Sequence, residues 1–389
     1  MISFKLFFNL IFILFYFQSI STSFAQKEEK LSFSIAYFSN EKKSLNILDV
    51  EGQKFSDERI VNGHTTQSFG FNTAEFWFKI VIPPHDSKMF LEIPFAVLDS
   101  VSLYTKDETG EWVMMTAGDQ QPMSQRIIPF HVPVFPIEIQ NGKVNVCYLR
   151  IKSEGSLTIP IRLLTYHEFI YDGFKVQMQF GLLFGAILVL ILVNILLWSF
   201  YRLPNSLLLA FTLFSALYFI LCLNGYWQSL FLGDNVALSN PSMQFGLLLW
   251  AFFLSLYSKK AAYTIFHAPF LHKLLDYFML LACIQFVLIW FLPFKMMIQI
   301  SIILGVLTSV VSFAAFLLAR ARGYSDVKFS LTGMYFYIVG IFMSSLKFFG
   351  ILETTFFSEF GIEIGVFSQA VFFTIAQFKT NSTRETLSK

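Results

Sequence analysis

Residues 181–200 read GLLFGAILVLILVNILLWSF, and residues 361–378 read GIEIGVFSQAVFFTIAQF. These runs belong to the first and the last of seven long apolar segments, which short polar breaks separate. A helix needs about 20 apolar residues to cross a bilayer core about 30 Å thick. Lipid offers exposed backbone amides no hydrogen-bond partner, so each segment is predicted to form a helix. The seven predicted spans cover residues 176–200, 206–224, 239–257, 274–292, 297–319, 330–349 and 360–378.

The composition also excludes an ordinary soluble protein, because 55% of the 389 residues are hydrophobic and only 14% are charged. Residues 1–25 are typical of a secretory signal peptide: Lys5 precedes a short apolar core, and a small-x-small site ends at Ala25. An uncleaved anchor is the alternative. We predict a signal peptide at 1–25, an exported domain at 26–170, a seven-helix membrane domain at 171–378 and a short cytoplasmic tail at 379–389.

The exported region has the pattern of β-strands. In the run EFWFKIVI at residues 75–82, Phe76, Phe78 and Ile80 share one face. Similar short runs follow at roughly even spacing, with Gly and Asn-Gly breaks between them. Many short strands without a helical period predict an all-β sandwich or jelly roll, and about 145 residues suffice for one such core.

Charge and cysteine content exclude several classes of function for this region. It carries 14 Lys and Arg against 18 Asp and Glu, which excludes nucleic-acid binding. Cys147 is its only cysteine, since Cys222 and Cys283 fall in predicted spans. An internal disulfide and a cysteine metal cluster are therefore excluded. No constellation of catalytic residues stands out, and we predict no enzyme activity, no metal and no cofactor.

The placement of basic residues predicts the orientation in the membrane. With the N-terminal domain outside and seven spans, the C-terminus lies inside. The inner side then holds ten basic residues and the outer side three: Arg202, Lys259, Lys260, Lys273, Arg320, Arg322, Lys328, Lys379, Arg384 and Lys389 inside, and Lys175, Lys295 and Lys347 outside. This bias predicts a bacterial inner-membrane protein with a periplasmic N-terminal domain and a cytoplasmic C-terminus.

Several motifs occur in the order found in a known family. Trp77 and its aromatic neighbours are followed by LEIPFAVLDSVSLYT at 91–105, QPMSQRIIPFHVPVFPI at 121–137 and CYLRIKSEGSLTIPIRLL at 147–164. In the membrane region, Asn194 lies in the first span and a YRLPN turn follows that span. From about residue 30 to 380, the chain resembles the seven-transmembrane receptors with diverse intracellular signalling modules.

The resemblance implies a sensory jelly roll similar to carbohydrate-binding domains. Family members commonly continue into a C-terminal output domain, whereas only residues 379–389 follow the last span here. The resemblance therefore implies that any signal passes to a separate protein or to another copy. In the last span the family commonly has a glutamate where this chain has Gln369, so a charge-based signalling role is not carried over to that position.

Four residues of the exported domain are candidates for binding a ligand. Arg126 and Arg150 lie where the family often has arginines, and together they could clamp a carboxylate or phosphate. Ordinary ion pairs are the alternative. Tyr104 and Trp112 flank a turn and could stack on a sugar ring or form a cross-strand aromatic pair. Trp77 is expected to pack in the core or cover the sheet rather than bind a sugar.

Three further residues are candidates for coupling the exported domain to the helices. Asn194 is predicted to hydrogen-bond a neighbouring helix, a contact worth about 1 kcal/mol. Lys347 and Glu363 could form an ion pair at the outer surface, and solvated interfacial charges are the alternative. Residues 224–227 are interpreted as the ordinary outer end of a span.

These features predict a receptor-like integral membrane protein. A small ligand, with carbohydrate as one class, would bind the β domain, and the seven-helix bundle would relay this to a cytoplasmic signalling protein. The first alternative is an envelope glycan-binding or assembly anchor without switching, and the second is a transporter or membrane enzyme. Membrane lipid and a second copy of the chain are the other predicted partners, and nucleic acid is not one.

Overall fold

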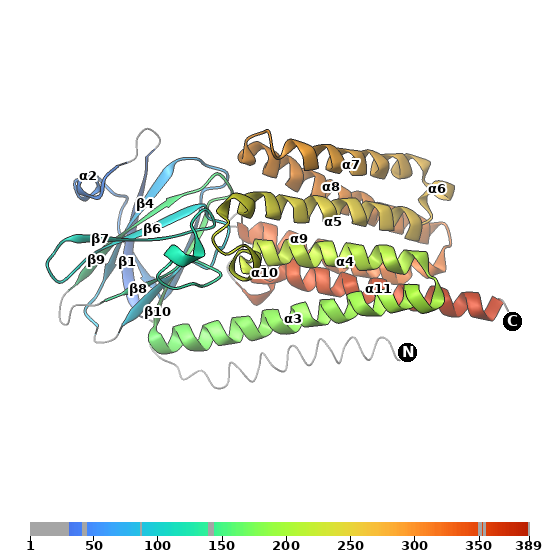
Figure 1. Cartoon of the computed structure of the whole chain (residues 1–389), viewed down its shortest axis with the longest axis horizontal. Coiled ribbons are helices and arrows are strands. Elements are labelled where there is room, and N and C mark those ends of the chain that lie inside the picture. The colour runs from blue at the N-terminus through green and yellow to red at the C-terminus, as the bar shows by residue number, and fades with distance from the viewer. Residues whose placement is uncertain are drawn as a thin grey trace.

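The computed structural model describes residues 31–387, apart from 41–44, 86–87, 139–143, 349–351 and 353–354. The predicted signal peptide at 1–25 lies outside the described residues. A β domain and a bundle of long helices lie end to end along the long axis of the molecule (Figure 1). The predicted fold class, an all-β N-terminal domain followed by a seven-helix bundle, is confirmed.

The β domain is a sandwich of two sheets with antiparallel pairing. The strand order is β2-β1-β4-β9-β6-β7 in one sheet and β3-β10-β5-β8 in the other. The strands are β1 (Ser32–Asn40), β2 (Arg59–Asn62), β3 (His64–Ser68), β4 (Glu75–Ile82), β5 (Met89–Glu92), β6 (Ser100–Lys106), β7 (Trp112–Ala117), β8 (Val134–Ile137), β9 (Asn145–Lys152) and β10 (Thr158–Thr165). A short helix, α2 (Ile47–Glu51), separates β1 from β2 in the chain.

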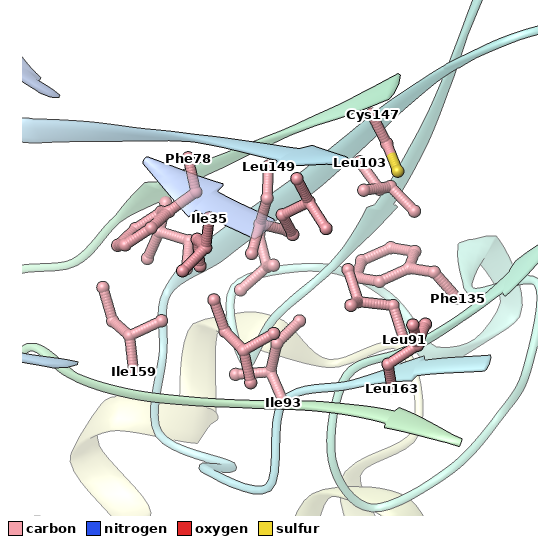
Figure 2. Packing of buried hydrophobic residues seen from close by; sticks show 14 of the residues in the cluster. Ile35, Phe78, Leu91, Ile93, Leu103, Phe135, Cys147, Leu149, Ile159 and Leu163 are labelled. Carbon is pink, nitrogen blue, oxygen red and sulfur yellow. The ribbon is translucent and has the colours of Figure 1, made fainter. Parts of the chain in front are cut away.

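The two sheets bury one apolar core between them. Figure 2 shows Phe78 and Leu149 of the six-stranded sheet opposite Leu91 and Leu163 of the four-stranded sheet. Phe78 confirms the predicted alternation, because its neighbour Trp77 packs in a separate cluster on the other face of the sheet. Each large apolar side chain that leaves water contributes about 1.5–3 kcal/mol, so this core accounts for a domain without disulfides.

Cys147 on β9 lies inside this core, where burial raises the pKa of its thiol to about 12. At a pH of about 8, only about one thiol in 10,000 would be ionised, so we expect no measurable reaction with a maleimide. The measurement uses full-length protein in which Cys222 and Cys283 are alanine, with unfolded protein as the positive control. Rapid labelling of the folded protein would contradict a closed core.

Seven helices among the described residues are long and apolar enough to cross a membrane, as predicted. They are α3 (Tyr166–Tyr201), α4 (Pro204–Leu223), α5 (Ser239–Ala261), α7 (Pro269–Leu288), α8 (Phe294–Ala321), α9 (Lys328–Phe348) and α11 (Gly361–Leu387). The connection from α4 to α5 contains the short helices η2 (Gln228–Leu232) and η3 (Val236–Leu238). The predicted tail begins inside α11, which continues to Leu387.

Helix α3 begins well before the span predicted from the sequence. It starts at Tyr166, directly after β10, whereas the predicted span begins at residue 176. A capping box explains this start, since Glu168 N donates to Thr165 Oγ1 and Thr165 N donates to the Glu168 carboxylate. Figure 1 shows α3 running from the β domain along the bundle. Strand β10 of the four-stranded sheet thus continues directly into the first membrane helix.

Helices α9 and α11 pack with their backbones in close contact. A Cβ atom on Gly340 would lie 2.1 Å from the Gly361 carbonyl oxygen, and one on Gly365 would lie 3.1 Å from Tyr337 Cα. Small residues allow this close approach between membrane helices. A movement of the N-terminal end of α11 would therefore involve α9 as well.

Candidate functional site

Three of the four predicted ligand residues lie together on the face of the six-stranded sheet that is turned away from the core. Tyr104 on β6 stacks on Trp77 of β4, with ring centroids 5.3 Å apart. Trp112 on β7 meets Tyr148 of β9 edge-on at 5.5 Å. The Arg150 guanidinium on β9 lies over the Trp77 ring at 5.8 Å.

Helix α2 covers this aromatic face. Ile47 and Val50 pack into the same cluster, and Trp77 is fully buried. Glu51, the last residue of α2, pairs with Lys106 of β6 at 3.0 Å. Trp77 therefore packs in a covered cluster, as its position in the sequence predicts, rather than forming an open platform for a sugar.

A buried carboxylate organises the polar groups of this face. Glu75 is 7% exposed, and it accepts hydrogen bonds from Trp77 Nε1 at 2.7 Å and from Arg150 Nη2 at 2.6 Å. Arg150 thus forms the ordinary ion pair that was the alternative to a ligand clamp. Its charge is balanced within the β domain.

We expect Glu75→Ala to destabilise the β domain by about 2–3 kcal/mol, because Arg150 and the buried Trp77 would both lose their acceptor. Glu58→Ala is the matched control, since exposed Glu58 pairs with Lys79 at 3.0 Å and such pairs are worth less than about 1 kcal/mol. Thermal unfolding of the full-length variants measures the difference. Equal losses from the two substitutions would contradict the role of Glu75.

Arg126 has different partners from Arg150. Its guanidinium donates to the carbonyl oxygens of Gly118 and Phe130, at 2.6 and 2.9 Å, and to Gln228 Oε1 at 3.0 Å. Each guanidinium is held by its own set of acceptors, and the clamp of Arg126 and Arg150 on a ligand stays a prediction. Arg126 is 7% exposed, and Gln228 belongs to the helical region. Arg126 thus connects the two parts of the molecule.

The contact around Arg126 joins the β domain to the connection between α4 and α5. Gln228 Nε2 donates to the Asp119 carbonyl oxygen at 2.8 Å, and Ser124 N donates to Asp234 Oδ1 at 2.9 Å. We call this contact the junction; it comprises Asp119, Ser124, Arg126 and His131 of the β domain and Gly225, Tyr226, Gln228 and Asp234 of the α4–α5 connection. A crevice beside Asp119 and Gln228 has room for about one water molecule.

The aromatic part of the junction brings a glycine against the β domain. His131 stacks on Tyr226 at 4.4 Å, and Tyr226 packs against Phe180 and Phe184 of α3. Burial lowers the pKa of His131 to about 4, so its ring is neutral at physiological pH. Gly225 has a φ of +75°, and a Cβ there would lie 2.2 Å from the His131 carbonyl oxygen. Glycine is required here for both reasons.

The junction is continued into α11 by hydrogen-bonded and aromatic contacts. Asn224 Nδ2 donates to Glu363 Oε1 at 2.9 Å, and Phe180 of α3 packs on Phe360 at 5.5 Å. Glu363 therefore bonds to the end of α4. The side chain of Lys347 lies outside the described residues, so the Lys347–Glu363 ion pair stays a prediction.

Asn194 makes the interhelical hydrogen bond that its position predicts. Its Nδ2 donates to Thr374 Oγ1 of α11 at 2.8 Å and to the Leu190 carbonyl oxygen of its own helix. Asn194 is fully buried. Helices α3 and α11 are thus bonded to each other inside the bundle, in addition to their contacts near the junction.

A second polar contact fixes the start of α3 to the β domain. Arg162 on β10 pairs with Glu92 of β5 at 3.0 Å and with Asp172 of α3. Burial raises the pKa of Glu92, and the charge of Arg162 opposes this effect. Phe169 of α3 stacks on Phe90 of β5 at 4.8 Å. The first turns of α3 therefore move with the four-stranded sheet.

Gln228 and Gly225 are not among the residues predicted from the sequence. Residues 224–227 have the composition of an ordinary outer span end, but the structure places them against the β domain. The local signal is limited to a glycine and a few polar residues among the aromatic and apolar ones in the run NGYWQSLFL at 224–232. No three His, Cys, Asp or Glu side chains of the described part of the chain lie together as metal ligands.

Two family models match the chain, and their ranges coincide with the two parts of the fold. The model described as 7TMR-DISM extracellular 2 matches residues 33–165, and the model described as 7TM diverse intracellular signalling matches residues 177–378. A comparison with curated proteins gives no match. A receptor-type architecture, with an extracellular β domain on seven membrane helices, follows from these matches. The chain belongs to the seven-transmembrane receptors with diverse intracellular signalling modules.

Proposed function

We propose that this protein is a receptor that binds a small ligand in its β domain and relays the binding through its helices to a cytoplasmic signalling protein. The proposal rests on the hydrogen bonds of Gln228. This residue belongs to the α4–α5 connection and bonds to both Arg126 and Asp119 of the β domain. Asn224, which lies four residues before Gln228 in the chain, bonds to Glu363 of α11. A displacement of the β domain would therefore reach α11. A ligand shifts such an equilibrium only if it binds the two arrangements with different affinities.

As the ligand we propose a small molecule with an anionic group, of which an acidic saccharide is the leading class. The aromatic face combines the half-buried ring of Trp112 with the cations Lys106 and Arg150. Both cations now pair with glutamates, so an anionic ligand would compete with Glu51 and Glu75. Displacing Glu51 from Lys106 would remove one of the contacts that hold α2 on the sheet, beside the packing of Ile47 and Val50. Ligand binding would thus alter the packing of the β domain.

We further propose that the β domain lies in the periplasm of a bacterial inner membrane and that α11 ends in the cytoplasm. The excess of basic residues in the loops at the far end of the bundle supports this orientation. Arg202, Lys260 and Arg322 are exposed there. Such a surface suits anionic lipid headgroups and a cytoplasmic partner with an acidic face.

The relay is tested with full-length protein in lipid nanodiscs. Nitroxide labels at Lys260→Cys on α5 and Phe378→Cys on α11 report the distance between the inner helix ends, in a variant whose three native cysteines are alanine. An array of neutral and acidic saccharides first identifies a binder, which is then added to the labelled protein. We expect an acidic saccharide to bind and to change the distance. The Gln228→Ala variant should bind it equally well without the change.

Each other outcome rejects part of the proposal. Binding that leaves the distance unchanged in the wild-type protein would favour the anchor without switching. Absence of binding to every saccharide on the array would reject the proposed ligand class. Conversion of a saccharide by the purified protein would replace the receptor with a membrane enzyme.

A further inference from the structure

Two carboxyl groups meet at the edge of the junction. Asp99 precedes β6 and Asp119 follows β7; Asp119 N donates to the Leu98 carbonyl oxygen at 2.8 Å, and Gln120 N donates to the Asp99 carbonyl oxygen at 3.1 Å. The carboxyl group of Asp99 lies close enough to that of Asp119 to disfavour its ionisation. A second negative charge beside Asp99 would be repelled, so Asp119 favours its protonated form.

The surroundings of this pair exclude most water. Asp119 is 7% exposed, and one oxygen of each carboxyl group, Oδ1, is buried without a hydrogen-bond partner among the described residues. Gly118 approaches so closely that a Cβ on it would lie 2.4 Å from the Asp99 carbonyl oxygen. A second negative charge beside Asp99 is costly in such a place, so Asp119 keeps its proton.

We propose that the buried carboxyl group of Asp119, beside Asp99, keeps its proton while the β domain is docked, and that loss of this proton loosens the junction. The Asp119 carbonyl oxygen accepts from Gln228, and the carbonyl oxygen of the adjacent Gly118 accepts from Arg126. A second negative charge would push the two carboxylates apart and would attract the Arg126 guanidinium away from Gln228 Oε1. The junction would therefore respond to the pH on its side of the membrane without any ligand, which goes beyond the proposed receptor function.

The direction of the response follows from Asp119. Burial and the neighbouring Asp99 raise the pKa of Asp119 well above its usual value of 3.8, and Arg126 opposes them. The docked state thus binds the proton more tightly than an open, solvated state. The stabilisation of the docked state by this proton is complete below pH 3.8, and it is lost as the pH rises through the raised pKa of Asp119. Over that window, the ratio of open to docked molecules rises by up to about tenfold per pH unit, because one proton is released.

The other titratable groups of the junction do not supply this response. Burial lowers the pKa of His131 to about 4, so the docked state favours its neutral form, and protonation of His131 would favour opening at low pH, which is the opposite direction. Hydrogen bonds from Ser124 lower the pKa of Asp234, which therefore stays ionised. Glu154 contributes only its backbone N–H, which donates to Asp99 Oδ2 at 2.6 Å, while its own side chain is exposed.

The test measures the mobility of the junction in ligand-free, full-length protein. A nitroxide label at the exposed position Gln125→Cys, in the variant without native cysteines, is followed between about pH 5 and about pH 9 in nanodiscs. We expect an immobile label at low pH and a growing mobile fraction as the pH rises. The Asp119→Asn variant, which mimics the protonated form, should stay immobile at every pH, whereas Glu154→Gln should keep the wild-type profile. An unchanged profile in Asp119→Asn would overturn the proposal.

Two further measurements keep the proposal testable if Asp119→Asn does not fold. Asp99→Asn retains an acceptor for the Glu154 N–H and should move the pH response to lower pH, because it removes the neighbouring carboxylate and leaves the burial of Asp119. In the wild-type protein, infrared difference spectra between low and high pH should show the carbonyl band of a buried, protonated carboxylic acid that disappears with rising pH. Absence of this band at low pH would overturn the protonated state of Asp119. Because no ligand is added, these results do not depend on the ligand relay.

Discussion

Gly225→Ala is expected to leave the β domain and the bundle folded but no longer docked on each other. The added Cβ would lie 2.2 Å from the His131 carbonyl oxygen and 2.7 Å from Ala96 Cβ, so the two surfaces must separate to admit it. The φ of +75° adds about 1 kcal/mol of strain for a non-glycine residue. Overpacking at the contact costs about a further 1–3 kcal/mol. The two effects together should weaken the docking of the domains by about 3 kcal/mol.

Gly233→Ala provides the matched control for this substitution. Gly233 lies in the same connection and also has a positive φ, +56°, but a Cβ there would meet nothing within 4 Å. This variant should therefore show the backbone strain without the steric clash. Mobility of a label at Gln125→Cys compares the two variants. Similar mobility in both would mean that the contact between Gly225 and His131 does not hold the domains together.

Arg126→Ala is expected to have the largest effect among the polar residues of the junction. The substitution removes the donor for the carbonyl oxygens of Gly118 and Phe130 and for Gln228, all in a buried setting. Hydrogen bonds to a charged donor contribute about 1.5–3 kcal/mol each and are not additive, so the loss should be about 3–5 kcal/mol. Thermal unfolding and the mobility of the label at Gln125→Cys measure it in full-length protein.

Arg126→Lys and Arg150→Ala serve as controls. A lysine keeps the charge but cannot serve several acceptors with a planar fork, so Arg126→Lys should give an intermediate loss. Arg150→Ala removes the ion pair with Glu75 and should leave the label at Gln125→Cys immobile. If Arg126→Ala instead leaves stability and mobility unchanged but abolishes ligand binding, Arg126 is a ligand contact and not a structural connection.

Features that repeat along a single element could be predicted from the sequence. The strand around Phe78 follows from a local alternation and the seven spans from the length of continuous apolar runs, and the structure contains both. The hydrogen bond of Asn194 could be anticipated for a different reason. A buried amide in a membrane helix needs a partner on its own or a neighbouring helix, although the identity of Thr374 was not predictable.

Contacts between segments that are distant in the chain could not be predicted, because no local sequence pattern indicates them. Gln228 and Arg126 are 102 positions apart in the chain, and no period relates a loop of the β domain to a loop between two spans. The cover formed by α2 escaped prediction because a five-residue helix with two buried apolar residues, Ile47 and Val50, is too short to show periodicity. Arg126 was assigned to a ligand because its type and position were visible while its acceptors were not.

The unbroken course of α3 from Thr165 into the bundle gives the β domain a fixed rotational phase relative to the membrane helices. One residue inserted between Glu168 and Phe180 would turn everything beyond it by about 100° and advance it by about 1.5 Å. Tyr226 would then face away from His131. Insertions of about seven residues nearly restore the phase, since two turns of helix contain about that number. Chimeras that graft another sensory domain onto this bundle must therefore count residues in this stretch.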